Sequence, residues 1–331
     1  MPRSCAPGSF RILFLTHVAD PGGAEFKMLD LCREVSERAE VLLFQHGSLE
    51  ALVREQAIPY TVHPMPAAAR GVRRESGRWG IVKAIPAVLS MIRAVARKGR
   101  EFDVIVAFSQ KSFVVAALAK VFMRRPIVWF MNDILAPSHF SRTLIRLLVI
   151  LSRYGADHIA LNSQASLSAW RAAGGRQRGV SVIYPGIQDE QVVAQLRDPR
   201  RVAAYKNRFS PDARPLIGMF GRIGRWKGQE VFLRAIAKLP DVRAIIVGGA
   251  LFGEEPYEAE IRRLAADLGI GPRVGFLGHV QDVMTLMAAC DVVAHCSIAP
   301  EPFGLVIAEA MLAGTPVVAS DAGGARDPAE E

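Results

Sequence analysis

Short apolar runs alternate along the chain with longer segments in which apolar residues recur at helical spacing. In the first part of the chain these runs predict strands at residues 10–16, 41–44, 104–108, 127–130, 159–162 and 180–184. Helices are expected after the loop at 20–25, up to about residue 38, and at 113–122. Short strands that alternate with helices are typical of a parallel sheet with crossover helices.

The pattern breaks at Pro185-Gly186 and starts again at Leu216. A second set of apolar runs predicts strands at residues 216–220, 244–247, 274–277, 291–296 and 316–319. The segments between these runs predict helices at residues 230–239, 258–268, 283–289 and 304–314. We therefore expect an α/β protein with two Rossmann-like domains, 1–186 and 215–331, that face a central cleft and are joined by a charged linker at 187–214.

The composition is that of a folded protein without a membrane span. Half of the 331 residues are hydrophobic and 22% are charged, so the chain can bury substantial cores. No run of about 18 apolar residues occurs, and the first residues lack the apolar region of a signal peptide. The four cysteines have no C-x-x-C spacing, and no Asp-x-Asp pair occurs. We expect a cytoplasmic protein with reduced thiols, no metal site and no cofactor.

The net charge of +9 is concentrated in residues 70–100, which hold nine basic residues and one acid. Apolar positions near helical spacing at 80–97 predict a basic amphipathic helix, which favours an anionic acceptor or an anionic membrane surface at the inner membrane face. The alternative is a helix that faces the core and exposes its basic side to water. Nucleic acid is not expected as a partner, because Trp79 is the only aromatic residue interleaved with these charges.

Residues 300–320 combine a loop, a helix and a strand, and they hold two carboxylates. Glu301 lies in the loop and Glu309 in the helix, with seven residues between them. Gly304 marks the start of this helix and Gly314 its end, and the apolar run 316–319 predicts a short buried strand. Ligands of such α/β units bind at the carboxyl ends of the strands.

The start of this helix is suited to a phosphate group. The N–H groups of Phe303, Gly304 and Leu305 would open the helix, where unpaired amides and the helix dipole favour an anion. We expect Glu309 to lie two turns into the helix and to reach back to a sugar hydroxyl. The alternative is a helix with one capping and one solvated glutamate.

Two glycine-bearing loops follow predicted strands. Gly22 and Gly23 come after the first strand, where backbone amides can approach a ligand, although a plain turn has the same pattern. In the loop 221–228, Arg222 and Lys227 are suited to a diphosphate, because Arg binds phosphate oxygens bidentately and Lys acts as a point charge. These cations and the amides at 303–305 would balance the charge of a leaving diphosphate without a metal. Two solvated basic residues are the alternative.

Together these residues resemble the GT-B glycosyltransferases of the family-4 (glycogen synthase-like, retaining) type. Gly-Arg-Ile-x-x-x-Lys-Gly at 221–228 is similar to the phosphate-binding loop of the family, and the segment 301–309 is similar to its E-x7-E motif. Gly-Gly-Ala-Glu at 22–25 resembles its N-terminal glycine loop, and Leu-Gly-His-Val at 277–280 resembles the loop beside the nucleotide base. The similarity extends from about residue 10 to residue 325.

The resemblance implies a metal-independent hexosyltransferase that moves a sugar, with retention, from a UDP- or GDP-type donor to a glycan, glycolipid or lipid-linked acceptor. The first domain would hold the acceptor and the second the donor. Arg222 and Lys227 would bind the diphosphate, Glu309 the ribose, and Glu301 would lie near the transferred sugar as nucleophile or as stabiliser of oxocarbenium charge. The donor-binding residues it implies are Gly22, Gly23, Gly221, Arg222, Lys227, Gly278, His279, Val280, Phe303, Gly304, Leu305 and Glu309.

The chain departs from the family pattern in two places. Asn132 stands where the family commonly has His, and Asn can hydrogen-bond a sugar hydroxyl but cannot carry a proton at neutral pH. Our hypothesis is that Asn132 orients the donor sugar as part of the catalytic set with Glu301, Arg222 and Lys227.

The sequence ends at Glu331, where the family continues with further helices, so we expect an incomplete C-terminal domain with an exposed apolar edge. The alternative function is a non-catalytic nucleotide-sugar binding module or an inactive truncated homologue.

Overall fold

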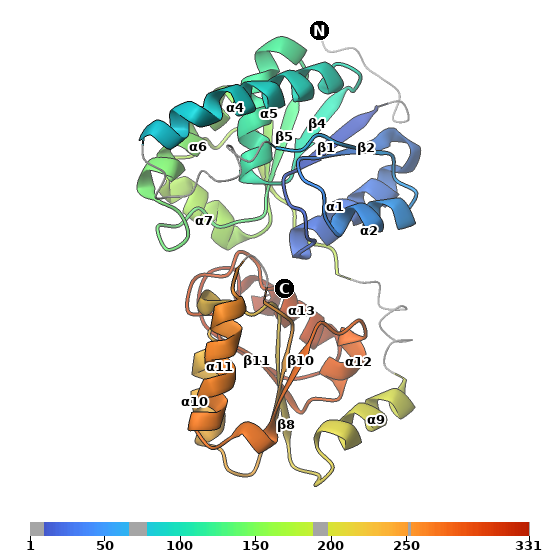
Figure 1. Cartoon of the computed structure of the whole chain (residues 1–331), viewed down its shortest axis with the longest axis vertical. Helices are drawn as coiled ribbons and strands as arrows, with labels where there is room; N and C mark the ends of the chain where they lie inside the picture. Colours follow the sequence, from blue (N-terminus) through green and yellow to red (C-terminus); the bar gives the residue numbers. More distant parts are fainter. Residues whose placement is uncertain (1–9, 66–77, 188–197, 251–252, 331) are drawn as a thin grey trace. The chain divides into compact units, whose positions relative to one another are not determined.

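The computed structural model describes residues 10–65, 78–187, 198–250 and 253–330. The chain divides into two compact units, Met1–Pro185 and Gly186–Glu331. Each unit contains one parallel sheet with helices on its faces, as Figure 1 shows. The α/β class expected from the sequence is confirmed.

The first unit is built on a seven-stranded parallel sheet of order β3-β2-β1-β4-β5-β6-β7. Its strands are β1 Ile12–Thr16, β2 Ala39–Leu43, β3 Tyr60–Val62, β4 Val104–Ala107, β5 Ile127–Met131, β6 His158–Leu161 and β7 Val180–Val182. Its helices are α1 Gly23–Val35, α2 Leu49–Glu55, α4 Arg78–Gly99, α5 Gln110–Met123, α6 Arg142–Gly155 and α7 Gln164–Ala172, with a 3₁₀ turn η1 at Ser36–Arg38.

Apolar side chains from both faces of this sheet form its core. One cluster joins α1 and α2 to the sheet through residues such as Met28, Leu29 and Val53. Another joins α4 and α5 to it through residues such as Met91 and Val115. Helices α4, α5 and α6 lie side by side (Figure 1). Because both faces are covered, the central strands are apolar almost throughout, which is why their positions could be predicted.

The second unit has a five-stranded parallel sheet of order β10-β9-β8-β11-β12. Its strands are β8 Leu216–Phe220, β9 Arg243–Val247, β10 Val274–Gly278, β11 Val292–His295 and β12 Val317–Ala319. Its helices are α9 Pro199–Phe209, α10 Gln229–Ala237, α11 Glu255–Asp267, α12 Val283–Ala288, α13 Leu305–Leu312 and α14 Asp327–Glu330, with 3₁₀ turns η2 at Arg225–Lys227 and η3 at Gly271–Arg273.

Strand β12 differs from its prediction as a buried strand. It pairs with β11 on one side and is the last strand of the sheet, so no strand of the described part of the chain pairs with its other side. Because side chains project from the faces of a sheet and not from its edge, the 66% exposure of Val318 shows that the described residues leave this face of β12 largely uncovered.

Helix α9 lies within residues 187–214, which the sequence analysis assigns to a linker. It packs against α12 and β9 and therefore belongs to the second unit. Tyr205 and Phe209 of α9 adjoin the apolar cluster that also contains Leu286 and Val293. Its polar side is anchored by Lys206, which forms an ion pair with Asp291 at the start of β11.

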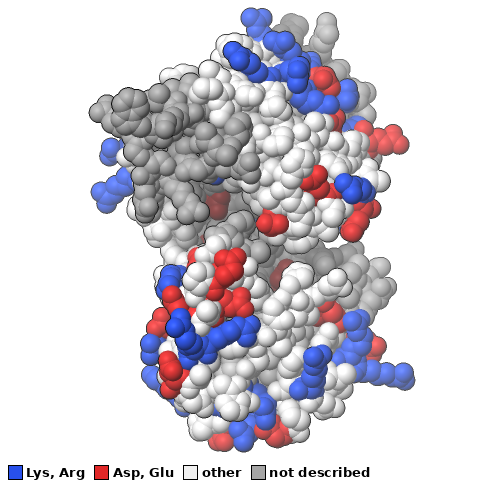
Figure 2. Space-filling view, in the orientation of Figure 1, with Lys and Arg blue, Asp and Glu red and all other residues white. Residues whose placement is uncertain are grey.

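Charged side chains on the second unit are mostly matched with partners of opposite sign. Arg225 pairs with Glu260, Arg234 with Glu230, and Arg262 with Glu258, at 2.7–2.8 Å between nitrogen and oxygen. Figure 2 shows this mixture of blue and red side chains over the surface of the second unit. Each exposed pair contributes little stability, but together they keep this surface close to neutral.

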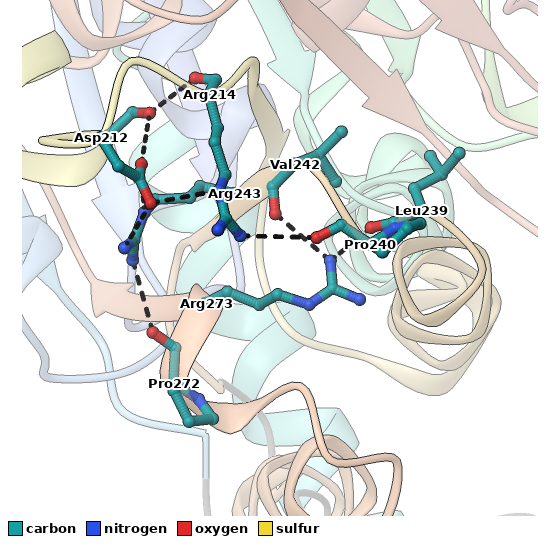
Figure 3. A network of polar contacts seen from close by, with 9 residues as sticks. Asp212, Arg214, Leu239, Pro240, Val242, Arg243, Pro272 and Arg273 are labelled. Atoms are coloured by element: carbon teal, nitrogen blue, oxygen red, sulfur yellow. Dashed lines mark hydrogen bonds and ion pairs between the residues drawn. The ribbon is translucent and has the colours of Figure 1, made fainter.

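An arginine network closes the amino ends of β9 and β10 (Figure 3). Arg243 donates to both oxygens of Asp212 at 2.9 Å, and this hydrogen bond lowers the pKa of Asp212 to about 2. Arg273 donates to the carbonyl oxygens of Ile236, Leu239 and Val242, at and beyond the end of α10. These arginines hydrogen-bond backbone carbonyl groups at the amino ends of the strands. Ligands of such sheets bind at the carboxyl ends, on the opposite side.

The basic segment 70–100 is described from residue 78 onwards, so its residues 70–77 lie outside the described part of the chain. Residues 78–99 form the expected helix, α4. Met91 and Val95 are buried on its inner side, whereas Arg93 and Arg97 are exposed. Within the described part of the chain, no helix is both long and apolar enough to cross a bilayer.

Candidate functional site

The strand order of the second sheet reverses between β8 and β11, which are neighbours although β9 and β10 separate them along the chain. At such a reversal the connections leave toward opposite faces of the sheet, and a crevice opens at the carboxyl ends of the two strands. The loop 221–228 follows β8, and the loop 296–304 follows β11. The fold therefore brings together the two segments that the sequence analysis assigned to the donor.

Two glycines allow these loops to approach closely. Gly228 has a φ of 76°, and a Cβ atom there would lie 2.0 Å from the carbonyl oxygen of Cys296. Gly248, which follows β9, has a φ of 126°, and its Cβ would lie 2.1 Å from the carbonyl oxygen of Gly221. The N–H of Ile298 donates to the carbonyl oxygen of Trp226 at 2.8 Å, which fixes one loop on the other.

Glu301 lies at the centre of a buried polar cluster. The Lys227 ammonium contacts Oε1 at 3.0 Å and Oε2 at 2.9 Å. Ser297 Oγ donates to Oε2 at 3.0 Å, and His295 Nε2 lies 3.2 Å from the same oxygen. His295 and Ser297 are each 5% exposed and Glu301 is 8% exposed, so this is a desolvated arrangement of charges.

The cluster keeps Glu301 ionised. Burial on its own would raise the pKa of this carboxyl, but the hydrogen bond from His295 and the charge of Lys227 outweigh it and lower the pKa to about 2. At neutral pH the group is a carboxylate. It can face a developing positive charge or act as a nucleophile, but it cannot serve as a proton donor.

The backbone of Glu301 is fixed as well as its side chain. Gly324 N–H donates to the Glu301 carbonyl oxygen, at 2.6 Å, and Glu301 forms an isolated bridge with Gly323. A Cβ on Gly323 would lie 2.6 Å from that oxygen, and one on Gly324 would lie 2.4 Å from the carbonyl oxygen of Pro302. The glycines after β12 thus hold the loop that carries the carboxylate.

Arg222 and Lys227 both lie close to the ring of Trp226. The Arg222 guanidinium is 5.7 Å and the Lys227 ammonium 4.2 Å from the centre of the Trp226 ring. Arg222 is exposed, whereas Lys227 is directed inward onto Glu301. The two predicted cations are therefore in one place but differ in their surroundings.

Glu309 has an environment opposite to that of Glu301. It is the fifth residue of α13, a little over one turn from the start of the helix, and not two turns as expected. Burial raises its pKa to about 7, and no residue that the structure describes forms an ion pair with it. The carboxyl is thus poised to accept or donate hydrogen bonds near neutral pH.

The remaining predicted residues of the second unit lie at the same edge of the sheet. Gly304, with a φ of 92°, caps the start of α13, and Phe303 and Leu305 lie on either side of it. Gly278 ends β10, and its carbonyl oxygen accepts from Gly248 N–H at 2.7 Å. His279 is exposed beside Gly278, and Val280 packs against the apolar core.

In the first unit, the acidic side chain of Glu25 binds a backbone amide of the glycine loop. Gly22 N–H donates to Glu25 Oε2 at 3.1 Å, and Gly23 is the first residue of α1. Glu25 is 5% exposed, and burial raises its pKa, although the hydrogen bond from Gly22 opposes this. The Glu25 side chain therefore already occupies one of the backbone N–H groups that a phosphate at this helix start would use.

Asn132 follows β5 in the first unit. Its Nδ2 group lies 3.4 Å from the carbonyl oxygen of Phe108 and 3.5 Å from that of Phe130, at the long end of hydrogen-bond distances. Its Oδ1 atom is buried and accepts no hydrogen bond from the described residues. An orphaned buried acceptor of this kind is suited to a hydroxyl donor.

Four residues of the crevice are not among those predicted from the sequence, namely Trp226, Gly248, His295 and Ser297. His295 lies within the apolar run 291–296, and a polar residue near the end of such a run is a signal in itself. Gly248 is followed by Gly249 directly after a strand, which is the same signal that pointed to Gly22 and Gly23. Among the described residues, no three His, Cys, Asp or Glu side chains are grouped as metal ligands would be.

Comparison with known proteins gives consistent results for both units. A family model described as glycosyl transferases group 1 matches residues 204–331, and one described as glycosyltransferase family 4 matches residues 21–191. The crystal structure of Anabaena HepE in complex with UDP and glucose is 40% identical, covers 96% of this chain and 83% of its own, and superposes with a TM-score of 0.83. The structure of the same protein with UDP-glucose is 39% identical, with a TM-score of 0.83.

Curated relatives match the chain over a shorter length. D-inositol 3-phosphate glycosyltransferase of Mycolicibacterium smegmatis is 33% identical over 172 residues, which are 51% of this chain and 38% of that protein. The protein of the same description from Mycobacterium bovis is 39% identical over 148 residues, 30% of its length. The chain thus matches well under half of the length of these relatives.

Proposed function

The chain belongs to the GT-B glycosyltransferases of the family-4 type, and from this premise we propose that it transfers a sugar from a UDP-sugar to a carbohydrate-type acceptor. A glycan, a glycolipid or a lipid-linked sugar is the acceptor class we expect, with retention at the anomeric carbon. UDP is favoured over GDP because HepE, at 40% identity, was crystallised with UDP and with UDP-glucose.

The observation that carries this proposal is the Lys227–Glu301 pair at the reversal of the second sheet. A half-buried lysine, a second cation at Arg222 and the first amides of α13 lie at the carboxyl ends of neighbouring strands. This set would neutralise a diphosphate without a metal ion, since fixed donors in a dry site stabilise developing charge strongly. Loss of one such donor costs about 3–4 kcal/mol of transition-state stabilisation.

Each carboxyl group has a distinct role in the proposed reaction. Glu301 is ionised and would face the positive charge that develops on the transferred sugar as the diphosphate leaves. Glu309 would accept hydrogen bonds from the vicinal hydroxyls of the donor ribose. Asn132 would accept a hydrogen bond from a sugar hydroxyl through its orphaned Oδ1, and it supplies no proton.

A thermal-shift titration with UDP, GDP, UDP-glucose and GDP-glucose tests the donor assignment. A ligand at 100 times its dissociation constant stabilises the folded state by about 2.7 kcal/mol. We expect stabilisation by UDP and UDP-glucose in the wild type and its loss in Lys227→Met. Stabilisation by GDP alone would overturn the choice of base, and no effect of any nucleotide on the folded protein would overturn the donor site.

The second candidate is a binding module that holds a nucleotide sugar without transferring it. Asn132 at the position of a family histidine is the observation that favours it. UDP release from UDP-glucose, with water or a disaccharide as acceptor, separates the two. Tight binding of UDP-glucose without UDP release under any condition would support the binding module.

We propose in addition that the first unit associates with an anionic membrane surface, where a lipid-linked acceptor would be found. Helices α4, α5 and α6 carry five, two and three Lys or Arg residues and no Asp or Glu. Leu147, Ile150 and Tyr154 on α6 are each more than half exposed, between 54% and 79%. An apolar stripe beside arginines is suited to the headgroup region of an anionic bilayer.

Sedimentation with vesicles tests this association. We expect binding to phosphatidylglycerol-containing vesicles at low salt, weaker binding at high salt, and none to pure phosphatidylcholine. Ile150→Glu should abolish binding, whereas Val231→Glu on α10, at an apolar position of the second unit that is 48% exposed against 55% for Ile150, should not. Absence of binding at low salt would refute the proposal.

A further inference from the structure

We propose that His295 and Ser297 are positioning residues that hold oxygen Oε2 of Glu301, so that Oε1 turns to the donor sugar when Lys227 moves to the diphosphate. This inference rests on the proposed function, because it assigns Lys227 to the donor. It assigns different roles to the two oxygens of the Glu301 carboxylate, and it identifies the side chains that determine these roles.

The two oxygens of Glu301 have different partners. Oε2 contacts Ser297 Oγ at 3.0 Å, His295 Nε2 at 3.2 Å and Lys227 Nζ at 2.9 Å. Oε1 contacts only Lys227 Nζ among the described residues, at 3.0 Å. Departure of the lysine would therefore leave Oε2 with two donors and Oε1 with none, which frees one defined oxygen for a ligand.

The donors that remain are on rigid structure. His295 is the last residue of β11, Ser297 follows it two residues later, and both are almost completely buried. The peptide groups of this region are fixed by Ser320, whose N–H donates to the His295 carbonyl oxygen at 2.9 Å. Lys227, in contrast, reaches Glu301 through a four-carbon stem that can rotate toward another anion.

The hydrogen-bond pattern assigns the proton of His295 to Nε2. Nε2 lies between Glu301 Oε2 and Ser297 Oγ, at 3.2 and 3.1 Å, whereas buried Nδ1 has no partner among the described residues. Ser297 donates its hydroxyl proton to Glu301, so the single Nε2–H of His295 is shared between the carboxylate and the serine oxygen. A buried imidazole with one unsatisfied nitrogen costs stability and is retained more readily where the other nitrogen has a function.

Holding Oε2 matters because Glu301 is buried. Without Lys227, and without His295 and Ser297, a desolvated carboxyl would take up a proton or turn toward solvent. With the two donors in place it stays ionised and directed. The donor diphosphate could thus draw Lys227 away from Glu301 without discharging the carboxylate that the sugar needs.

The first experiment needs no turnover. Lys227→Met mimics departure of the lysine, and NMR titration of 13Cδ-labelled glutamate follows the Glu301 carboxyl, assigned by its loss in Glu301→Gln. We expect Glu301 in Lys227→Met to remain ionised down to about pH 5, and its midpoint in Lys227→Met/His295→Leu to rise by at least one pH unit. Equal midpoints in the two proteins would overturn the inference, whether or not the protein transfers sugar.

The second experiment measures UDP release from UDP-glucose. His295→Leu should lower kcat by about 10- to 100-fold, the effect of one lost hydrogen bond to a charged group, with the Kd for UDP changed less than about threefold. The acidic limb of the kcat–pH profile should move to higher pH. His295→Gln, which places an N–H near the position of Nε2, should restore most of kcat, and Ser297→Ala should have a smaller effect than His295→Leu.

A purely structural role for His295 predicts a different outcome. Thr315 is also buried in the second unit, and its hydroxyl donates to the Met287 carbonyl oxygen at 2.8 Å, so Thr315→Val is a matched control for loss of a buried polar group. If kcat falls in step with the melting temperature in both variants, and the pH profile stays unchanged, the positioning role is refuted. If the wild type binds no nucleotide, the proposed function fails, and the carboxyl titration still decides this inference.

Discussion

The two sheets of this protein have the same kind of strand reversal, and the side chains at the two reversals differ in charge. In the first unit the order reverses between β1 and β4, where Gly22 N–H is bound by the buried Glu25 and where His17 Nδ1 contacts Ser109 Oγ at 2.7 Å. In the second unit it reverses between β8 and β11, where Lys227 lies on Glu301. Each reversal is followed by a glycine-bearing loop and a helix.

This difference in charged side chains shows that the fold determines where a crevice forms, and that the side chains determine which ligand it can bind. At the first reversal the acidic side chain of Glu25 occupies the start of α1. Burial lowers the pKa of His17 to about 4, so the His17 side chain carries no positive charge for a phosphate at neutral pH. At the second, two cations, Arg222 and Lys227, lie in a loop whose close packing against its neighbours depends on glycines. A glycine-bearing loop between a strand and a helix occurs at both reversals, so this pattern alone does not predict which of them binds a phosphate.

The largest effect is expected for Lys227→Met. Removal of one cation from the diphosphate site should lower kcat/KM for UDP-glucose by about 10²- to 10³-fold, or about 3–4 kcal/mol, in a UDP-release assay. Lys111→Met, which removes an exposed cation close to His17 at the first reversal, should change this value less than about twofold. Equal losses in the two variants would remove the distinction between the reversals.

Gly228→Ala tests the backbone of the second loop. Its φ of 76° and the 2.0 Å approach to the Cys296 carbonyl oxygen leave no room for a methyl group, so the unfolding free energy should fall by about 2–4 kcal/mol in urea denaturation. Gly22→Ala at the first reversal, whose nearest neighbour would be Glu25 Oε2 at 3.5 Å, should have little effect. A stable Gly228→Ala protein with intact UDP binding would contradict the packing described for the loop.

Glu309→Gln sharpens the contrast between the two carboxyls. The folded-state pKa of Glu309 is raised to about 7, so the wild type loses stability as the pH rises from the unfolded value of 4.5 to 7. The glutamine variant escapes this loss and should be more stable than the wild type by about 1–3 kcal/mol at pH 8, with no difference at pH 4. Chemical denaturation at the two pH values measures it. A variant that is less stable at pH 8 would show that Glu309 has a stabilising partner.

The contribution of Glu301 to stability depends on pH with the opposite sign. Its folded-state pKa of about 2 lies below the unfolded value of 4.5, so its contribution to stability is present above 4.5 and is lost as the pH falls toward 2. The two carboxyls of one motif thus respond to different pH windows.

Apart from the control variants, Asn132→Ala has the smallest expected effect. Loss of one neutral hydrogen bond to the donor sugar should lower kcat by about tenfold, with the Kd for UDP unchanged, since UDP lacks the sugar. Steady-state kinetics with UDP-glucose and calorimetry with UDP measure the two quantities. Unchanged turnover would remove Asn132 from the catalytic set.

The fold and most of the crevice residues could be predicted from the sequence, but the contacts between them could not. The buried strands were found because both faces of each sheet are covered, which makes their sequences apolar throughout. Tyr60–Val62 was missed, because a three-residue edge strand carries too little pattern. The contact of Lys227 with Glu301 joins residues 74 positions apart, and nothing in the sequence indicates that His295 faces the same carboxylate.

The central claim is that the donor diphosphate binds at the second reversal and not at the first. Amide chemical-shift mapping with UDP, on the deuterated 331-residue chain, observes both loops in one experiment. The account predicts shifts at residues 221–228 and 301–309 that saturate together, and their absence in Lys227→Met. Shifts confined to residues 22–25 and their surroundings would contradict it.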